Sequence, residues 1–570
     1  VALETEDGLA TDAAETSVEL NVGDRTGLDL KLTGTGIGDH KLKVTVTAPN
    51  GDVQVKELTL GVRAASAPVT TSKLLPLGIG ETVTLDKSLF DGMVPHTGEA
   101  TLAIGAIARL DVPGLLLSLD RYPYGCAEQT SSRALPLLYL NEVAAMVGIG
   151  TDAEIDQRIK DAIKNLLSKQ TSSGGFGLWD PYSTTDLWLD SYVTEFLLRA
   201  KAAGYEVPEL AMTRALDNLG NQVSYATDFT LGGEDVAFAL YDLARAGRAA
   251  IGDLRYYLEA RLSNFGSPLA KAQLGAALAL YGDKTRAATA FQAAVEDLKA
   301  REEKNKYRID YGSQLRDTAG VLALAAEFKP AGVDIAALTS RLGTLRDQAR
   351  WTSTQEDAWT LVAASALGQS AADGTVSIDG EKLTGSPYRR YDQEHFDGLS
   401  VEVTNNGNQP TEMKVTSTAI PAEPPGPSEN GFTLQRDYYT VTGEVADFSN
   451  VKQNDRFVVV LTAQPTQLGS GQYVIADPLP AGFEIENPDL LQGSGVADLS
   501  WLTLDTPSHV ESRTDQFVAA FRFTSATSSV TTANMVRAVS PGSFVMPGAT
   551  VEDMYRPELR ANTDAGQIEV

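Results

Sequence analysis

The chain contains very little cysteine and histidine. Its 570 residues include 1 cysteine, Cys126, and 4 histidines. A single cysteine excludes an internal disulfide framework, so cysteine pairing gives no information about the redox compartment. None of the histidines lies between residues 97 and 394; they are His40, His96, His395 and His509. The middle of the chain therefore lacks the imidazole base of a Ser-His-Asp hydrolase, and it offers one cysteine and no histidine for a zinc site.

Long apolar runs and an excess of basic residues are also missing. No stretch of 18 consecutive apolar residues occurs, so we expect no membrane-spanning segment. The formal net charge of −28 argues against binding to nucleic acid, whose phosphates require basic surfaces. Dinucleotide, Walker-type and His-Glu-x-x-His motifs are absent, so we expect no cofactor and no metal. The acidic pairs at 234–235 and 356–357 are interpreted as residues at helix starts.

What the chain does contain is a cysteine three residues before a glutamine. Cys126 and Gln129 have the arrangement needed for an intrachain thioester, in which the Gln129 carbonyl acylates the sulfur and ammonia leaves. The offset of three residues would bring both side chains to one face of a first helical turn. A nucleophile that attacks the former Gln129 carbonyl would be captured covalently, and the thiol would be freed. The alternative interpretation is an inert Cys126 that is simply a small buried hydrophobe.

The residues around this pair carry a resemblance to a known family. The stretch 121–130, Arg-Tyr-Pro-Tyr-Gly-Cys-Ala-Glu-Gln-Thr, resembles the thioester motif of the alpha-2-macroglobulins and complement components, and its Tyr-Pro-Tyr-Gly lead-in is similar to the bacterial branch. Within this motif, Gly125 would permit a tight backbone turn beside the sulfur, and Glu128 is a supporting residue. Tyr122 and Tyr124 would separate the thioester from water; the alternative for both is an ordinary half-buried core position.

Sequence periodicity predicts β-structure at the start of the chain and helices in the middle. Alternating apolar and polar residues predict strands at 17–22 and 41–47, with a turn at 49–52 before a further strand. We therefore expect residues 1–62 to form a small immunoglobulin-like or macroglobulin-like β-sandwich. From residue 111 to about residue 370, Ala and Leu recur at helical spacing.

Five helical segments in that middle region look alike. They start 44, 36, 45 and 40 residues apart, which is the period of helical hairpin repeats; they are residues 190–203, 234–246, 270–281, 315–328 and 355–367. Small side chains within them would let neighbouring helices approach closely. We expect these hairpins to close into an α/α toroid.

Strand patterns flank the helical region on both sides. Before it, strands are predicted at 81–85 and 100–104; after it, at 399–404 and 412–416. This order implies one sheet domain interrupted by a long insertion. Residues 421–427 are a stiff, proline-rich linker, and strands beyond it are predicted at 457–461, 473–475 and 517–521.

The family resemblance implies the same multidomain, mixed α and β layout. It places a CUB domain at 63–110 and 371–420, split by a thioester-containing α/α toroid at 111–370, and a receptor-binding-like β-sandwich at 421–570. Residues 351–359, 477–487 and 551–557 also resemble segments of bacterial members. In the last of these, the family implies that Met554 packs over the thioester; the alternative is that Met554 belongs to the sandwich core.

The implied function is that of the C-terminal part of a broad-spectrum protease inhibitor. In the family, a protease cuts a bait region, the thioester becomes exposed, and it tethers the protease through a lysine amine. The chain would therefore be a single-use covalent trap and not an enzyme. Because the helical region has no histidine to relay the acyl group, we expect amines to be preferred over hydroxyls.

The resemblance also implies a cellular setting. It points to a monomer in the periplasm, held to the inner membrane by a lipid upstream of this chain, with proteases as targets and a peptidoglycan synthase as a partner. The chain begins Val-Ala-Leu-Glu without the basic and apolar segments of a signal peptide, so we interpret it as a mature product or a piece of a longer protein.

Two other functions fit parts of the sequence. Terpenoid cyclases share the α/α toroid and its glycine-aromatic loops, such as residues 174–179, but their Asp-rich magnesium motif is absent. A non-reactive adhesive or scaffold module would need only the domains, with Cys126 inert.

Overall fold

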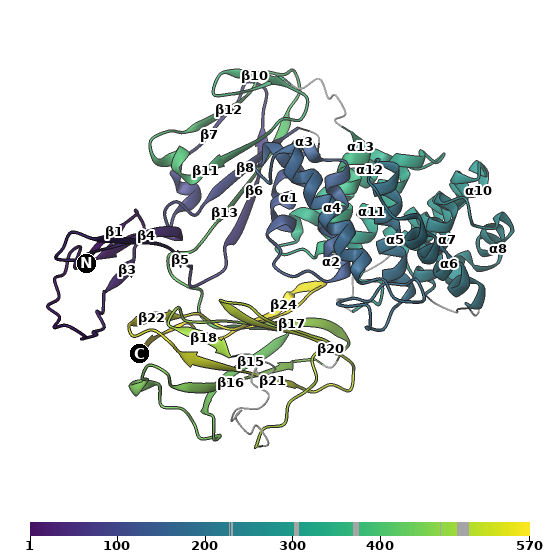
Figure 1. Ribbon diagram of the computed structural model, residues 1–570. Helices are drawn as coiled ribbons and strands as arrows, with labels where there is room; N and C mark the ends of the chain where they lie inside the picture. The colour runs from purple at the N-terminus through teal and green to yellow at the C-terminus, as the bar shows by residue number, and fades with distance from the viewer. Residues whose placement is uncertain are drawn as a thin grey trace.

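The computed structural model describes residues 1–570 except 106, 227–228, 230–231, 301–306, 369–374, 468 and 487–500. A helical domain forms one side of the molecule, and β-sheet regions lie beside and below it (Figure 1). The mixed α and β multidomain class expected from the sequence is confirmed. Residue 487, which ends the motif 477–487, and the expected boundary at 370–371 lie outside the described residues.

The N-terminal region differs from its prediction. It contains a three-stranded sheet in the order β1-β4-β5 and a two-stranded ribbon; the strands are β1 (Ala2–Thr5), β2 (Leu9–Thr11), β3 (Leu32–Gly34), β4 (Gly38–Thr47) and β5 (Val53–Val62). The turn between β4 and β5 was correctly predicted. The strand predicted at 17–22 is wrong, because no neighbouring strand pairs with it and Val22 is fully exposed. Within residues 1–62, the buried apolar side chains are only Leu3, Leu9 and Leu42, too few for the core of a closed sandwich.

Two four-stranded sheets combine strands from before and after the helical domain. Their orders are β10-β9-β12-β7 and β11-β8-β13-β6. The strands are β6 (Val69–Leu77), β7 (Thr82–Leu85), β8 (Glu99–Ile104), β9 (Thr375–Ile378), β10 (Glu381–Thr384), β11 (Tyr388–Asp392), β12 (Val401–Asn405) and β13 (Thr411–Ala419). Strand β13 pairs with both β6 and β8, so residues more than 300 positions apart share one core. The four strands predicted in these segments are confirmed.

The helical domain contains thirteen α-helices in its described residues. They are α1 (Val112–Arg121), α2 (Ala127–Ala134), α3 (Asn141–Met146), α4 (Asp152–Ser168), α5 (Leu187–Ala202), α6 (Glu209–Tyr225), α7 (Glu234–Arg245), α8 (Ile251–Arg261), α9 (Pro268–Leu280), α10 (Lys284–Ala300), α11 (Gln314–Phe328), α12 (Ile335–Gln348) and α13 (Thr354–Leu367). Short 3-10 turns also occur in the chain: η1 (Lys87–Phe90), η2 (Ala108–Leu110), η3 (Pro136–Leu138), η4 (Leu262–Asn264), η5 (Gln393–Asp397) and η6 (Phe448–Asn450).

Six of these helices form a closed inner ring. Helices α5, α7, α9, α11, α13 and α2 each pack against the next, and α2 packs back against α5. The five segments with the repeating pattern are therefore five of the inner helices, and α4, α6, α8, α10 and α12 each pack against one or two of the inner helices. Inner helices are buried almost all round, which explains their Ala- and Leu-rich composition. At Gly275 of α9, a Cβ would lie 2.8 Å from the Phe291 ring on α10, so this contact requires a residue without a side chain.

Capping residues set the starts of the inner helices. Ser353 and Glu356 form a reciprocal capping box at α13, and α7 begins at Glu234. The interpretation of the pairs 234–235 and 356–357 as helix-start residues is confirmed. The acidic residues also lie at the positive end of each helix dipole.

The C-terminal region is a two-layered β-sandwich. A six-stranded sheet has the order β14-β24-β23-β17-β20-β19, and a four-stranded sheet has the order β15-β16-β21-β18. The strands are β14 (Ser428–Asn430), β15 (Phe432–Thr440), β16 (Arg456–Pro465), β17 (Gly471–Pro478), β18 (Phe483–Glu486), β19 (His509–Ser512), β20 (Gln516–Phe523), β21 (Val530–Ala538), β22 (Ser543–Met546), β23 (Thr550–Asp553), β24 (Arg556–Asn562) and β25 (Gly566–Glu569). The predicted linker at 421–427 is irregular and exposed. In Figure 1 the end of β24 lies below α2.

Candidate functional site

Cys126 and Gln129 meet at the start of α2. Cys126 is the residue before the helix, and its Sγ accepts a hydrogen bond from the Gln129 backbone N–H at 3.5 Å. In return, Gln129 Oε1 accepts from the Cys126 backbone N–H at 3.2 Å. Both residues have no exposed surface. The three-residue offset therefore places the thiol and the carboxamide together on one helical turn, inside the protein.

The surroundings of Cys126 keep its sulfur un-ionised. Burial raises the pKa of the thiol, and the charge of Glu128 raises it further. The charge of Lys169 opposes this effect; its ammonium donates to the Gly125 carbonyl at 3.2 Å, and burial lowers the pKa of that ammonium. A turning-over cysteine nucleophile needs the opposite, a lowered thiol pKa. The site therefore suits a cysteine that is held in a bond, and it does not suit one that attacks as a thiolate.

Glu128 connects α2, the helix that starts after Cys126, to the start of α13 in the inner ring. Its buried carboxylate accepts hydrogen bonds from Ser132 Oγ at 2.5 Å, Thr354 Oγ1 at 3.1 Å and Gln355 Nε2 at 2.7 Å. Thr354 and Gln355 begin α13, so this one carboxylate joins α2 to α13. Burial raises the pKa of Glu128, and these hydrogen bonds counteract the rise. Glu128 of the thioester motif thus contacts residues of the segment 351–359. The sequence indicated both segments as family-like, but it did not predict that they meet.

The two motif tyrosines lie on the N-terminal side of α2. Tyr122 and Tyr124 form an edge-to-face pair with ring centroids 5.5 Å apart. The Gln129 amide donates to the Tyr122 hydroxyl at 3.5 Å, and Tyr124 is buried. Gly125 was expected to permit a tight backbone turn that needs a residue without a side chain. This reason is wrong, because the φ of Gly125 is not positive and a Cβ there would meet no atom within 4 Å. What the Gly125 position supplies is its carbonyl, which accepts from Lys169.

Met554 of the C-terminal sandwich packs into the helical domain. Its side chain is 3% exposed and belongs to the same apolar cluster as Cys126 and Tyr124, while the sandwich interior is formed by separate clusters. The next residue, Tyr555, places its ring 4.2 Å from that of Tyr311, measured between centroids. The structure therefore puts Met554 at the domain interface and not in the sandwich core.

Three arginines of the sandwich surround this interface. Arg513 donates to the Pro123 carbonyl at 2.9 Å and lies over the Tyr124 ring. Arg556 and Arg560 lie over the rings of Tyr307 and Trp351, which belong to the helical domain. Sequence reasoning missed these contacts. The only signal in the sequence was the spacing of Arg556 and Arg560, four residues apart, and this spacing does not identify a partner.

One histidine reaches the helical domain from outside it. The His509 ring stacks on the Trp179 indole at 4.2 Å and 2°, and its Nε2 contacts Glu511 at 3.1 Å. Trp179 follows Leu178, whose carbonyl accepts from the Ala127 backbone N–H at 2.7 Å. His509 lies in β19 and thus at the interface between the sandwich and the helical domain. His40, His96 and His395 belong to the other sheet regions.

The described part of the chain offers neither a metal site nor a membrane-spanning helix. No group of three or more His, Cys, Asp or Glu side chains there is arranged to hold a metal ion. Among its helices, none combines the length and apolar character that crossing a bilayer requires.

Sequence comparison relates the chain to known proteins. A profile of the bacterial alpha-2-macroglobulin MG10 domain matches residues 431–558. The alpha-2-macroglobulin of Escherichia coli is 31% identical over 97% of this chain and 35% of that protein, and the one from Xylella fastidiosa (strain Temecula1) is 30% identical over 95% and 35%. The chain thus spans about a third of the length of the curated relatives that it matches.

Solved structures agree with these relationships. The native Escherichia coli alpha-2-macroglobulin, crystallised from domain MG7 to the C-terminus, superposes with a TM-score of 0.88 at 29% identity over 100% of this chain and 93% of that one. The Salmonella alpha-2-macroglobulin reacted with methylamine has a TM-score of 0.87 at 30% identity, over 100% and 38%. The chain belongs to the bacterial alpha-2-macroglobulins and matches their C-terminal portion.

Proposed function

We propose that this chain carries the covalent trap of a protease inhibitor, with a thioester between Cys126 and Gln129. The observation that supports this proposal most is the buried, reciprocal pair of hydrogen bonds at the start of α2, in which each side chain accepts from the backbone N–H of the other residue. Formation of the bond joins Cys126 Sγ to the Gln129 side-chain carbonyl carbon and releases ammonia. An amine then attacks that carbon, an amide forms, the carbon–sulfur bond breaks, and the sulfur takes up the proton that the amine loses.

In the intact inhibitor, the captured amine would be a lysine side chain of an attacking protease. Each chain would react once, so the protein is a trap and not an enzyme that turns over. One of the related structures is of a Salmonella protein described as reacted with methylamine, a small amine of the same chemical class. Following the family, the bait region that starts the process would lie in a part of the protein upstream of this chain.

We assign shielding of the thioester to Tyr122, Tyr124 and Met554. A thioester in contact with water would hydrolyse, so the site must exclude water until a target is present. The two tyrosines close one wall from within the helical domain, while Met554 belongs to a domain that can move away. A flexible, apolar thioether fills the space without offering a competing nucleophile. Gly125 and Glu128 would support the motif through their contacts with Lys169, Thr354 and Gln355.

We further propose the domain assignments that the family implies. The strands β6–β8 and β9–β13 would form a CUB domain with the helical domain, residues 111–370, inserted in it. Residues 421–570 would be the receptor-binding-like domain, and residues 1–62 part of a macroglobulin-like domain. The proposed setting is a monomer in the periplasm, attached to the inner membrane by an upstream lipid and acting beside a peptidoglycan synthase.

Amines should be the preferred nucleophiles. No histidine lies within residues 97–394, and the one that reaches the helical domain, His509, is stacked on Trp179 and held by Glu511. An acyl-imidazole relay to hydroxyls would require His509 to leave both contacts.

A competition experiment tests the trap and its selectivity together. The protein is incubated with putrescine and excess glycerol, and adducts on the Gln129 peptide are read by mass spectrometry. The expected result is a putrescine amide, no glycerol ester, and no adduct in Cys126→Ala; Gln292→Ala, on the exposed side of α10, is the control and should react normally. Efficient ester formation would contradict the selectivity, and no adduct of either kind would indicate an inert scaffold module.

A further inference from the structure

A cavity of about 360 Å³ lies between the helical domain and the C-terminal sandwich. The starts of α5 and α7 contribute three carboxylates to its lining, Asp186, Glu234 and Asp235. The loop before α5 contributes Trp179, and the sandwich contributes Arg522 of β20. Both domains are thus needed to enclose this space.

Within the described residues, no lysine or arginine forms an ion pair with Asp186, Glu234 or Asp235, whereas Asp310 in the same cavity is paired with Arg308 and Arg316. Asp186 accepts from the Leu189 N–H at 2.8 Å as the cap of α5, and Asp235 accepts from the Val236 N–H. These backbone contacts leave negative charge in a partly desolvated space, where it attracts a cation more strongly than it would in water.

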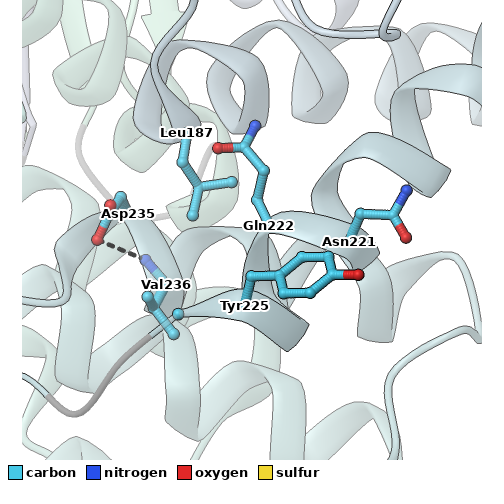
Figure 2. A pocket seen from close by; sticks show the side chains of 7 residues that line it. Leu187, Asn221, Gln222, Tyr225, Asp235 and Val236 are labelled. Atoms are coloured by element: carbon cyan, nitrogen blue, oxygen red, sulfur yellow. Dashed lines mark hydrogen bonds between the residues drawn. The ribbon is translucent and has the colours of Figure 1, made fainter.

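A hollow at the surface adjoins the cavity at the start of α7. This more open hollow of about 400 Å³ shares Leu187 and Asp235 with the cavity, and Figure 2 shows both residues together with Gln222 and Tyr225 around that hollow. Tyr225 is largely exposed at its rim. The carboxylate end of α7 can therefore be reached from solvent.

On its inner side the cavity borders the site of Cys126. Leu178, which lines it, accepts the backbone hydrogen bond of Ala127, the residue after Cys126. Tyr311 also lines it and belongs to the same apolar cluster as Cys126. Leu178 thus links the lining of the cavity to the residue that follows Cys126.

Trp179 provides a second, independent sign of a ligand. Its side chain is 9% exposed and lines the cavity, yet its Nε1–H has no hydrogen-bond partner among the described residues. An unsatisfied buried donor costs free energy, so such a group usually has a partner in the working state. A ligand with a cationic end and a carbonyl acceptor, such as a lysine residue in a polypeptide, fits both the carboxylates and this donor.

Arg522 places a positive charge at the cavity while the sandwich is docked on the helical domain. Burial raises the pKa of Asp186, and the charge of Arg522 opposes that shift, so the two groups interact across the cavity. Arg522 also counteracts the effect of burial on Tyr307. The arginine comes from β20 and would leave the cavity whenever the sandwich moves away from the helical domain.

We propose that the helical-domain wall of this cavity, with its carboxylates, is the binding site for the side chain of an incoming lysine, and that Arg522 faces this wall as a surrogate cation until the C-terminal sandwich moves. This inference rests on the proposed thioester function and adds to it the site that receives the nucleophile. The lysine ammonium binds between Asp186 and Glu234 and passes one proton to a carboxylate. The neutral amine attacks the Gln129 acyl carbon, the bond to Cys126 breaks, and the sulfur takes the second proton.

Two nucleophiles of different charge test the proposal on the full chain. The cationic probe is an Nα-acetylated lysine amide, and hydroxylamine, largely uncharged near neutral pH, is the neutral probe. The variants are Asp186→Asn, which can still cap α5, and Glu234→Gln; Asp253→Asn on the outer helix α8 is the charge-matched control. Release of the Cys126 thiol gives the rate, and the melting temperature of each variant checks its fold.

We expect each cavity variant to lower the rate of thiol release by the lysine probe about fivefold. This factor corresponds to about 1 kcal/mol for a partly buried charge contact. The rate with hydroxylamine should change less than twofold. Arg522→Gln should speed the lysine probe and leave hydroxylamine unchanged. Equal effects on both probes, or no effect of either carboxylate variant, would overturn the proposal while the thioester stands. If wild-type protein releases no thiol with either probe, the proposed function fails and this inference fails with it.

Discussion

The ring of Tyr555 in the C-terminal sandwich packs on the ring of Tyr311 in the helical domain, with centroids 4.2 Å apart. Tyr311 in turn meets Trp188 edge to face at 4.9 Å. This aromatic contact continues the apolar cluster that contains Cys126 and Met554. Separation of the two domains would therefore open the surroundings of Cys126 to water, which explains how a stored thioester could be protected and released by domain movement.

Replacement of Met554 should separate shielding from folding. Met554→Ala removes a side chain at the domain interface, so methylamine should consume the thioester several-fold faster while the melting temperature changes little. The control is Met535→Ala, which creates a cavity in a separate buried cluster on the other face of the four-stranded sheet, away from the interface, and should lower stability by about 2–5 kcal/mol without accelerating the reaction. An unchanged rate combined with a large fall in melting temperature would show that Met554 stabilises the fold and does not shield the thioester.

Glu128→Gln should weaken the junction of α2 and α13. An amide in place of the carboxylate turns one acceptor into a donor that faces Thr354 and Gln355, so a buried polar group loses its partner. We expect a loss of about 1–3 kcal/mol in the free energy of unfolding and less protein that carries a thioester after purification. Urea unfolding followed by circular dichroism measures the first effect and thiol titration the second. The control is Glu154→Gln, at an exposed capping residue of α4, which should show neither effect. Unchanged stability and an unchanged thioester content in Glu128→Gln would contradict the role of Glu128 in joining α2 to α13.

Asp357 should make the helical domain less stable as the pH rises. It is 2% exposed, and burial raises its pKa to about 6 from an ordinary 3.8. The folded state thus binds the Asp357 proton more tightly than the unfolded state does. The free energy of unfolding is therefore higher at low pH, and this gain, at most about 3 kcal/mol, is lost as the pH rises from about 4 to about 6. In Asp357→Asn, this part of the pH dependence should be missing from melting temperatures measured across that range. An identical pH dependence in wild type and variant would refute the assignment; Asp253→Asn serves as the control.

The local part of the site could be predicted from sequence because it depends on neighbours in the chain. Cys126 and Gln129 are three residues apart, and a single helical turn brings them together. The repeating pattern of the inner helices was likewise visible, since burial on all sides dictates their composition. The strand at 17–22 was not predicted correctly, because alternation alone does not supply a pairing partner.

The rest of the site depends on contacts between distant segments. Glu128 meets Thr354 and Gln355 only because the inner ring closes between α13 and α2. Trp179 meets His509, and Tyr311 meets Tyr555, only because the sandwich docks on the helical domain. No periodicity within one segment encodes such pairs, so they became visible only in the structure.

The intact mass of freshly purified protein is the most direct test of the central claim. Thioester formation between Cys126 and Gln129 removes one ammonia, so the account predicts a mass about 17 Da below that calculated from the sequence. Methylamine should then add its own mass once per chain and expose one titratable thiol, and Cys126→Ala should show the full calculated mass and no adduct. A full calculated mass in fresh wild-type protein, with no gain on methylamine treatment, would contradict the account.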